Sequence, residues 1–473
     1  MDDRFRQHGP KLPELADIMG GRLHGTVRGS EDSGITGVSS DTRRIETGNL
    51  FVAISGERFD GHEFVREAVQ AGASASLVSV EWYAQTGNGG SVNGVQIVVP
   101  DVIAALQKFA FWYRNQFELP VIAVTGSSGK TTTKDMISAV LGKRYQVFKT
   151  LGNLNSQLGV SEGLFSLAQD HNIAVIELGM TQAGELDRLA KLVRPSVGVI
   201  TNVGAAHIEY FDSIEGIARA KGEILDHLPP DGSAILNADD PLVMAESGRS
   251  KAQLITFGRS RDADIRLIAS ETETSGSSFS LSDGSQFRIN LMGEHQIMNA
   301  LVAVTAGRLF GIDDESIACA LEEMTPTTMR MEIKEIGRVR LINDTYNANP
   351  SSMEAALKAL ALNCGRKLAI LGDMLELGDH SVKAHREIGK QAAGVVNLII
   401  TVGEHAREIA DAALVEGMSA TQVFACSSND EAISTALERI RDGDMILVKG
   451  SRGMKMETIV DSIDLKFRER KNG

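Results

Sequence analysis

The sequence predicts an α/β protein of three domains, with doubly wound, mostly parallel sheets in the central and last domains. The chain has 473 residues, which at roughly 150 residues per domain corresponds to about three domains. Short apolar runs that end in Gly, Asn or Asp alternate with longer stretches of helical periodicity, a pattern typical of parallel βα units. Prolines 100 and 326 interrupt this pattern and divide the chain into three blocks.

The composition excludes several classes of protein. Lys and Arg number 48 and Asp and Glu number 62, so the formal charge is 48 minus 62, or -14. A nucleic-acid-binding protein needs a basic face that displaces phosphate counterions, and this balance disfavours one. The 42% of hydrophobic residues excludes disorder as the main state. We therefore expect a folded protein whose partners are small molecules rather than nucleic acid.

The same survey predicts a cytoplasmic protein without a membrane span. No apolar run approaches the roughly 18 to 20 residues that a spanning helix needs. The first residues include acidic ones and lack an apolar core, so they do not resemble a secretory signal. Cys319, Cys364 and Cys426 are odd in number and widely spaced, which suits neither a disulfide framework nor a zinc cluster.

Each block has its own pattern of strands. A small N-terminal α/β domain is expected over residues 1–100, a central domain over 101–325 and a C-terminal, Rossmann-like α/β domain over 326–473. A polar stretch over 260–285 indicates an antiparallel excursion or a loop, and helices are expected over 101–117 and 296–309. The expected strands are 50–54, 76–80, 95–99, 121–124, 174–177, 197–201, 233–236, 339–342, 367–371, 398–402 and 445–448.

A glycine-rich turn opens the central domain. The strand 121–124 leads into Thr125-Gly126-Ser127-Ser128-Gly129-Lys130-Thr131-Thr132, where a helix begins. In such a turn, backbone N–H groups surround phosphate oxygens, the lysine supplies a point charge, and a threonine hydroxyl can ligate Mg²⁺. Val124 stands where the full eight-residue pattern has its first Gly, so the match is to the shortened form G-x-x-G-K-T. The turn predicts a central P-loop-type sheet with a nucleotide site; the alternative is a structural Gly-rich turn.

Three polar residues that follow neighbouring strands are candidate partners of this turn. Glu177 ends the strand 174–177 at the edge where open α/β sheets bind ligands, and a carboxylate there suits Mg²⁺. Alone, such a residue is more often a helix cap. His207 follows the strand 197–201 and is either a second metal ligand or a polar loop residue. From spacing alone, Lys221 is either a phosphate contact or a surface charge.

Together these residues resemble a known family. The turn, Glu177, Asn202 with His207, Lys221, the segment Gly293-Glu294-His295-Gln296 with Asn299, and Arg330 are similar in order and spacing to the ATP-dependent Mur ligases, which build the peptide of bacterial cell-wall precursors. The resemblance extends over essentially the whole chain. The segments 343–353 and 371–378 resemble the branch that adds D-alanyl-D-alanine to UDP-N-acetylmuramoyl-tripeptide.

The resemblance implies an ATP site and an Mg²⁺ site. Lys130, His207, Lys221 and Arg330 are the implied catalytic residues, with Arg330 directed at the transferring phosphate. Two Mg²⁺ ions are implied, with Thr131, Glu177, His207 and Lys221 as ligands. Lys221 is implied to be carbamylated, which requires a neutral amine and hence a lowered pKa. The implied ATP-binding residues are Gly126, Ser127, Ser128, Gly129, Lys130, Thr131, Thr132, His295, Asn299, Arg330, Asp344, Tyr346 and Asn347.

The resemblance also implies two small-molecule substrates and a monomer. The residues implied to bind UDP-N-acetylmuramoyl-tripeptide and D-alanyl-D-alanine are Ser40, Asp41, Arg43, Asp60, His62, Asn153, Asn155, Asn349, Ser451 and Arg452. Without the resemblance, the segments 39–43 and 56–62 are turns with caps. The chain departs from the family pattern in two places: Met329 precedes Arg330 where Gly is commoner, and Gln296 stands where relatives often have Asn.

Two other functions remain open from the sequence. A related ligase would add a single amino acid, or glutamate to folate, and the stretch Tyr346-Asn347-Ala348-Asn349-Pro350 argues against it. A nucleotide-dependent switch would use ATP hydrolysis to change the shape of a partner protein, and it leaves the segment 344–353 unexplained.

Overall fold

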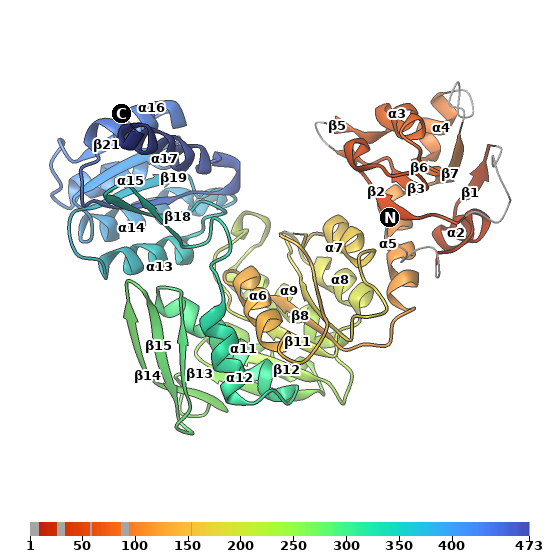
Figure 1. Ribbon diagram of the computed structural model, residues 1–473, viewed down its shortest axis with the longest axis horizontal. Helices are drawn as coiled ribbons and strands as arrows, with labels where there is room; N and C mark the ends of the chain where they lie inside the picture. The colour runs from red at the N-terminus through yellow and green to blue at the C-terminus, as the bar shows by residue number, and fades with distance from the viewer. Residues whose placement is uncertain (1–8, 26–33, 57–58, 87–93, 153, 473) are drawn as a thin grey trace. The chain divides into compact units, whose positions relative to one another are not determined.

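Figure 1 shows the computed structural model, which describes residues 9–25, 34–56, 59–86, 94–152 and 154–472. The chain divides into two compact units. The first unit consists of Met1–Ala123, Tyr145–Leu178 and Asp187–Pro195, and the second of Val124–Arg144, Gly179–Leu186 and Ser196–Gly473. The α/β class is as predicted.

The N-terminal block holds a five-stranded sheet with the order β1-β7-β6-β3-β2. β1 pairs with β7 in the antiparallel direction, and the remaining pairs are parallel. The strands β3, β6 and β7 confirm the predictions to within two residues. The strands are β1 (Arg22–His24), β2 (Gly37–Ser39), β3 (Asn49–Val52), β6 (Ala75–Ser79) and β7 (Val95–Val99), with a hairpin of β4 (Ser55–Gly56) and β5 (Phe59–Asp60). The helices are α2 (Leu12–Met19), η1 (Thr42–Arg44), η2 (Gly61–Phe64), α3 (Val65–Gln70), α4 (Val80–Gln85) and α5 (Val102–Arg114).

A nine-stranded sheet with the order β16-β15-β14-β13-β12-β11-β8-β10-β9 follows along the chain. Three of its strands, Val121–Thr125, Ile173–Glu177 and Val197–Ile200, are mostly apolar and are buried, as expected for parallel strands covered on both faces. The predicted antiparallel excursion is confirmed as the pairs β14/β15 and β15/β16. The strands are β8 (Val121–Thr125), β9 (Val147–Lys149), β10 (Ile173–Glu177), β11 (Val197–Ile200), β12 (Ser233–Asn237), β13 (Gln253–Gly258), β14 (Ile265–Glu273), β15 (Gly276–Leu281) and β16 (Gln286–Ile289).

The helices of this part include one that is buried over most of its circumference. In α11, eleven of the sixteen residues are buried, and α11 packs against α6. A helix of this kind forms part of the core. The helices are α6 (Lys130–Leu141), α7 (Gln157–Leu164), α8 (Glu185–Val193), η3 (Ile208–Tyr210), α9 (Ile214–Gly222), η4 (Glu223–His227), α10 (Pro241–Ala245), η5 (Ser247–Arg249), α11 (Glu294–Leu309) and α12 (Asp314–Glu323).

The C-terminal block is a six-stranded sheet with the order β17-β18-β22-β19-β20-β21. β17 and β18 are antiparallel, and the other pairs are parallel, so the doubly wound prediction is confirmed. The strands are β17 (Glu332–Ile336), β18 (Val339–Asp344), β19 (Lys367–Gly372), β20 (Leu398–Val402), β21 (Val423–Cys426) and β22 (Met445–Lys449). The helices are α13 (Pro350–Ala361), η6 (Gly378–His380), α14 (Ser381–Ala393), α15 (Arg407–Val415), α16 (Asn429–Arg439), η7 (Arg452–Met454) and α17 (Glu457–Asn472).

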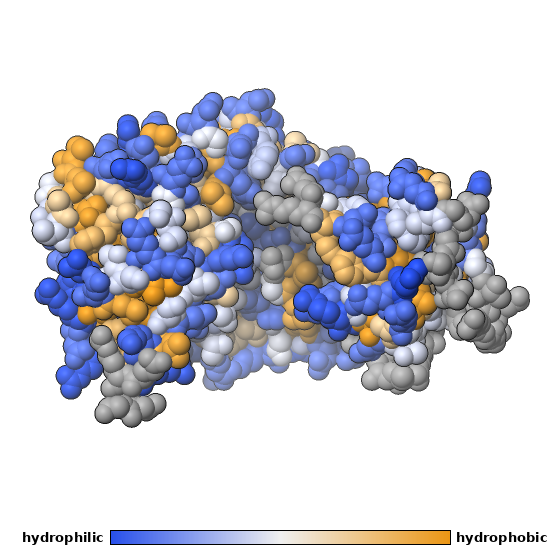
Figure 2. All heavy atoms as spheres, turned by 90° about the horizontal axis from the view of Figure 1, so that it is seen from above, coloured by the Kyte–Doolittle hydropathy of each residue, from blue (hydrophilic) through white to orange (hydrophobic). Residues whose placement is uncertain are grey.

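The surface is mostly hydrophilic on the face drawn in Figure 2, where apolar side chains gather in small groups between charged ones. Within the described ranges, the structure contains no helix whose length and apolar character suit a membrane crossing. Cys319, Cys364 and Cys426 are free thiols.

Candidate active site

The glycine-rich turn is held by the segment that follows β11. The Ser127 and Ser128 N–H groups donate to the main-chain oxygen and Oδ1 of Asn202, both at 3.0 Å, and Asn202 Nδ2 donates back to the Ser128 oxygen. The two glycines are required sterically. Gly126 has φ 151°, and a Cβ built on it would lie 1.9 Å from Thr201 Oγ1. Gly129 has φ 82°, and a Cβ built on it would lie 2.4 Å from Asn299 Oδ1. The turn therefore has one backbone shape that only this sequence pattern allows.

The helix α6 starts at Lys130, so its free N–H groups face the space above the turn. Lys130 Nζ donates to the Gly126 oxygen at 2.8 Å, which folds the ammonium back over the turn. Thr131 and Thr132 are buried in the next positions of the helix. The arrangement provides backbone donors, a cation and a hydroxyl in one place, which is the set of groups that binds nucleotide phosphates.

Arg330 reaches this turn from the segment before β17. Its Nη2 donates to Thr131 Oγ1 at 2.8 Å, and its guanidinium carbon lies 4.0 Å from the centre of the Tyr346 ring. Met329 and Met331, on either side of it, both have left-handed backbones with φ 61° and 51°. Non-glycine residues adopt this conformation at an energetic cost. Met329 stands where Gly is commoner in the family, and its φ lies in the left-handed region that favours Gly.

Asp344 and Lys449 form a buried ion pair at the adjoining strand ends. The register of β18 and β22 places the two residues opposite each other, and Lys449 Nζ lies 2.5 Å from Asp344 Oδ2. Lys449 also donates to the Asn347 oxygen, and Asp344 Oδ1 accepts from the Met331 N–H. Asp344 therefore fixes the segment that carries Arg330, in addition to the role in ATP binding that the resemblance implies. The resemblance places Lys449 in the loop that also holds Ser451 and Arg452, near the incoming amino component, and its contact with Asp344 was not predicted.

His295 and Asn299 project from the first turns of α11. Asn299 Oδ1 accepts from Thr133 Oγ1 at 3.2 Å, and its Nδ2 donates to Gln296, so this side chain is fixed beside α6. Burial lowers the pKa of His295 to about 4 despite the nearby Asp344 carboxylate. The imidazole is therefore neutral at pH 7 and is suited to contact a neutral ring rather than a phosphate.

Lys221 and His207 lie in the same unit as the turn. Lys221 is 2% exposed on α9, and burial, followed by the charge of Lys130, lowers its pKa well below the usual lysine value. His207 has a left-handed backbone with φ 62°, and its Nδ1 lies 2.7 Å from Oε2 of Glu376 in the last domain. The contact with His207 holds the pKa of Glu376 below its ordinary value. Glu376 lies within the family-like segment 371–378, but the sequence analysis gave it no role.

Glu177 and Asn155 contact each other in the first unit. Glu177 is 1% exposed, and its Oε1 accepts from Asn155 Nδ2 at 2.7 Å. A buried carboxylate is chemically suited to a hard cation. Asn153, the other asparagine predicted in this loop, lies outside the described residues.

Ser40, Asp41 and Arg43 form a compact cluster in the same unit. Ser40 Oγ donates to Glu162 of α7 at 2.5 Å. Arg43 donates two hydrogen bonds to Asp41, at 2.9 and 2.7 Å, and these bonds lower the pKa of Asp41 to about 2. The Arg43 side chain is otherwise exposed, which leaves a cation at the surface for an anionic ligand.

Asp60 and His62 form a closed network in the first domain. Asp60 Oδ1 lies 2.7 Å from His62 Nδ1 and also accepts from Ser55 Oγ. His62 Nε2 accepts from the Ser79 N–H at 3.0 Å, so both ring nitrogens are engaged. Although Ser, Asp and His meet here, the serine hydroxyl points to the carboxylate rather than to the imidazole, which excludes a serine-hydrolase arrangement.

Asn349 connects the C-terminal block to the turn, whereas Ser451 and Arg452 lie in the loop after β22. Asn349 caps α13 through the Ser352 N–H, and its Nδ2 lies 3.2 Å from Ser128 Oγ. Ser451 Oγ accepts from the Leu375 N–H and donates to the Ala348 oxygen. Arg452 is exposed and pairs with Glu457. The structure thus brings Asn349 to the phosphate turn and places Ser451 and Arg452 in the loop after β22.

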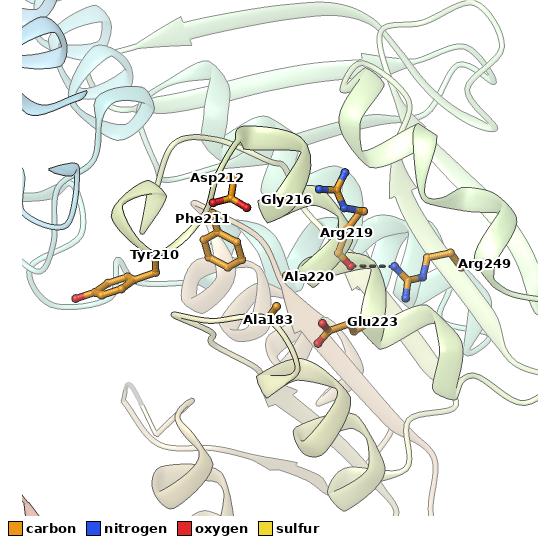
Figure 3. Close-up of a pocket in the computed structure, with 9 residues that line it drawn as sticks. All are labelled: Ala183, Tyr210, Phe211, Asp212, Gly216, Arg219, Ala220, Glu223 and Arg249. Carbon is orange, nitrogen blue, oxygen red and sulfur yellow. Dashed lines mark hydrogen bonds between the residues drawn. The ribbon is translucent and has the colours of Figure 1, made fainter. Parts of the chain in front are cut away.

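A pocket of about 440 Å³ lies beside α9 (Figure 3). Gly216, Arg219 and Ala220 come from one face of this helix, while Lys221 lies on another. Arg249 donates to the Arg219 carbonyl, as the dashed line shows, and Glu223 accepts from the Gly184 N–H. The full lining is Ala183, Tyr210, Phe211, Asp212, Gly216, Arg219, Ala220, Glu223 and Arg249.

The donor set fits Mg²⁺ held largely by phosphate and water. A hydroxyl, a carboxylate and a carbamate would supply hard oxygen ligands, and His207 a nitrogen. Across the described part of the chain, no group of three or more His, Cys, Asp or Glu side chains forms a ready-made metal centre.

The fold and the turn define an α/β enzyme class that binds a nucleotide at a phosphate loop and places an arginine from the segment before β17 against it. Family models identify this class further. The Mur ligase middle domain matches residues 124–307, the model described as Mur ligase, glutamate ligase domain matches 329–452, and the model described as Mur ligase family, catalytic domain matches 34–111. The chain belongs to the Mur ligase family, and the resemblance inferred from the sequence is confirmed.

Curated relatives and solved structures agree with this family. The UDP-N-acetylmuramoyl-tripeptide--D-alanyl-D-alanine ligase of Bacillus subtilis (strain 168) is 39% identical over 92% of this chain and 94% of its own length. That of Escherichia coli (strain K12) is 34% identical over 96% and 98%. A crystal structure of MurF from Acinetobacter baumannii superposes with a TM-score of 0.85 at 33% identity, covering 97% of this chain and 99% of the other. MurF ligase from Thermotoga maritima in complex with ADP gives 0.79 at 27% identity, covering 92% and 98%.

Proposed function

We propose that the chain is an ATP-dependent ligase that joins D-alanyl-D-alanine to the terminal carboxylate of UDP-N-acetylmuramoyl-tripeptide, releasing ADP and phosphate. This is a step in the synthesis of peptidoglycan precursors. The observation that carries the proposal is the contact of Arg330 with Thr131, because it places a cation of the last domain at the phosphate turn of the central one. The names of the relatives, at 34 to 39% identity over nearly the whole chain, supply the substrates.

The reaction requires activation of the carboxylate. A carboxylate and an ammonium do not condense in water, because both charges must be lost. A carboxylate oxygen attacks the γ-phosphorus of ATP and ADP leaves, which gives an acyl phosphate. The neutral amine of the dipeptide then attacks the acyl carbon, and the tetrahedral intermediate expels phosphate together with the original carboxylate oxygen. Water must be excluded, because it would hydrolyse the acyl phosphate.

Lys130 and Arg330 offset the repulsion between the carboxylate and the γ-phosphate. Both cations lie at the turn, where Lys130 contacts the Gly126 oxygen and Arg330 contacts Thr131. Donors that are already in place stabilise developing charge without reorganisation during the step. Holding two reactants in line lowers the barrier by roughly 7 to 11 kcal/mol in well-oriented systems. We assign Tyr346 and Asn347 to the same ATP site. The Tyr346 ring lies beneath the Arg330 guanidinium, and the Asn347 carbonyl accepts from Lys449 Nζ.

Two Mg²⁺ ions complete the charge balance in this proposal. Thr131, Glu177, His207 and carbamylated Lys221 would hold them, and the ions would supply Lewis-acid stabilisation of the phosphate oxygens. Lys221 suits carbamylation because burial and the positive charge of Lys130 lower the pKa of its amine. The amine therefore loses its proton readily. A carbamate converts that side chain into an oxygen ligand.

The remaining residues are assigned to the two substrates. In the first unit, Ser40, Asp41, Arg43 and Asn155 belong to the polar clusters described above, and we assign them with Asp60, His62 and Asn153 to the UDP-sugar substrate. In the last domain, Asn349, Ser451 and Arg452 are assigned to the incoming dipeptide. We also propose that the enzyme acts as a monomer in the cytoplasm, where free thiols such as these persist.

An amine panel tests the proposal. ADP formation is measured with purified UDP-N-acetylmuramoyl-tripeptide and, in turn, D-alanyl-D-alanine, D-glutamate, L-alanine and no addition. We expect ADP release that depends on D-alanyl-D-alanine. Stimulation by a single amino acid would identify a related ligase. Release that responds to no small amine would contradict ligase function and favour a nucleotide-dependent switch.

A further inference from the structure

The segment from Asp373 to Glu376, directly after β19, is fixed at each of its residues. Asp373 Oδ1 accepts from the Ala406 N–H at 2.6 Å. The Met374 N–H donates to Nε2 of the buried His385 at 2.9 Å, and the Leu375 N–H donates to Ser451 Oγ at 2.9 Å. Three anchors inside the last domain therefore set the position of the next residue, Glu376.

Glu376 meets His207 at the end of this segment. The distance from Glu376 Oε2 to His207 Nδ1 is 2.7 Å, and the Glu376 carbonyl accepts from the Glu209 N–H at 3.3 Å. Both residues hold left-handed backbones, each with φ 62°. Such conformations cost about 1 to 3 kcal/mol each and persist where the surrounding structure enforces them, often at functional sites. The pairing is thus built from two separately strained positions.

A carboxylate at Nδ1 determines the chemistry of the other ring nitrogen. Neutral imidazole carries its proton on one nitrogen and a lone pair on the other. An anion beside Nδ1 favours the tautomer with the proton there, which leaves Nε2 as the electron-pair donor. Metal-bound histidines in proteins nearly always have this arrangement, with a carboxylate or carbonyl oxygen at the second nitrogen.

We propose that Glu376 is a positioning residue that keeps the proton of His207 on Nδ1 and so presents Nε2 to the divalent cation bound with the nucleotide. The proposal rests on the metal role of His207 proposed above. It means that the last domain supplies part of the cation site of the central domain, although Glu376 itself does not ligate the cation. Docking of the last domain then raises the affinity for metal and nucleotide together.

Binding of Mn²⁺ in the presence of ADP tests this on the full-length protein. Free Mn²⁺ is measured by electron paramagnetic resonance for wild type, Glu376→Ala, Glu376→Gln, His207→Ala and the control Glu416→Gln. Glu416 is an exposed residue of the same domain, at the end of α15. Loss of an outer partner of a metal-binding histidine typically weakens metal affinity about 10- to 100-fold. We expect that loss for Glu376→Ala, a smaller one for Glu376→Gln, whose amide oxygen still accepts from Nδ1, and none for the control.

The outcomes separate this proposal from the one on which it rests. If Glu376→Ala binds Mn²⁺ as tightly as wild type while His207→Ala binds it weakly, the positioning role is wrong and the metal role of His207 stands. If His207→Ala also binds normally, the metal assignment of His207 fails, and the inference fails with it. Neither result affects the amine dependence of ADP release, which tests the ligase function independently.

The tautomer provides a second readout that loss of structure does not imitate. Long-range ¹⁵N–¹H spectra of histidine-labelled protein distinguish Nδ1–H from Nε2–H rings, and the His207 signal is identified by its absence in His207→Ala. We expect an Nδ1–H ring in wild type and in Glu376→Gln, and a shifted equilibrium in Glu376→Ala. An Nε2–H ring in folded wild type would overturn the proposal.

Discussion

Arg330 Nη2 donates to Thr131 Oγ1 at 2.8 Å, which joins the start of the last domain to the first turn of α6. The guanidinium also lies over the Tyr346 ring, so a residue of the last domain supports it from behind. Its position is therefore set before ATP binds. The planar group has further N–H donors beyond this bond, which suits the three oxygens of a transferring phosphate.

Replacement of Arg330 by lysine is expected to reduce kcat about 10²- to 10³-fold, the loss typical of a removed transition-state donor. Lysine keeps the charge but lacks the planar set of donors and stacks less well on Tyr346. Steady-state kinetics of Arg330→Lys against Arg338→Lys provides the comparison, since Arg338 is an exposed residue that pairs with Asp442. Equal kcat values for the two variants would show that Arg330 does not stabilise the transition state.

The left-handed backbone of Met329 predicts an unusual pattern of tolerance. Glycine adopts φ 61° freely, whereas a β-branched residue does not. Met329→Gly should leave the thermal midpoint and ligation close to wild type, and Met329→Val should lower the free energy of unfolding by about 1 to 2 kcal/mol. Met324→Val is the matched control, because Met324 has an extended backbone at φ -68°. A stable Met329→Val protein would show that the segment relaxes to a negative φ.

Lys130 should be indispensable to turnover but not to folding. Lys130→Ala removes the ammonium from the phosphate turn while the turn keeps its Asn202 anchors. We expect loss of ATP-dependent ligation with an unchanged circular dichroism spectrum, and full activity for the control Lys191→Ala, an exposed partner of Asp187. Ligation near the wild-type rate in Lys130→Ala would refute its role.

Lys221→Ala tests the carbamate. The substitution should abolish activity, and a short carboxylic acid added to the assay should restore part of it by occupying the place of the carbamate. In wild-type protein, ¹³C-labelled bicarbonate should give a carbamate signal that is absent from the variant. The exposed Lys251 serves as the alanine control. Undiminished activity of Lys221→Ala would eliminate the proposal.

The burial of His385 predicts how stability depends on pH. Its Nε2 accepts from the Met374 N–H, which requires a ring without a proton on that nitrogen, and its Nδ1 lies 2.8 Å from the Ser381 oxygen. Burial lowers the pKa of His385 and His405 adds to this, whereas the contact with the Ser381 oxygen and the carboxylates of Asp373 and Glu408 oppose it. The unfolded chain, with a histidine pKa of about 6.5, therefore binds more protons than the folded one below that pH. Stability is full above about pH 6.5 and falls as the pH decreases towards the folded pKa.

Chemical denaturation of wild type and His385→Gln at pH 7.5 and 5.5 measures this dependence. Glutamine places an amide oxygen near the former Nε2 and can accept from Met374, but it does not titrate. We expect wild type to lose more of its unfolding free energy between the two pH values than His385→Gln does. An equal loss in both proteins would show that His385 does not contribute to the acid sensitivity.

The central strands were predictable because they are buried on both faces. The strands β8, β10, β20 and β22 are unbroken apolar runs, and their predicted bounds differ from the observed ones by at most one residue. The strand β13 was missed because its first half is exposed, and β21 because it is only partly buried. Partly buried strands depend on their neighbours in the sheet, which the local sequence does not show.

The phosphate turn was predictable for a related reason. Glycine is required at its two positions because the backbone there lies close to Thr201 and Asn299. The requirement therefore appears as a recognisable pattern in a short stretch of sequence. By contrast, the pairs Asp344 with Lys449 and His207 with Glu376 join residues that are far apart in the chain. The register of β18 and β22 creates the first pair, and the anchored segment after β19 creates the second. Neither leaves a local pattern in the sequence.

Isotope transfer tests the acyl-phosphate mechanism most directly. UDP-N-acetylmuramoyl-tripeptide is labelled with ¹⁸O in its terminal carboxylate and incubated with the enzyme, ATP and D-alanyl-D-alanine, and the released phosphate is analysed by mass spectrometry. The mechanism predicts that one labelled oxygen of each ligated carboxylate appears in phosphate. Phosphate without the label would contradict an acyl phosphate and with it the assigned function of the site.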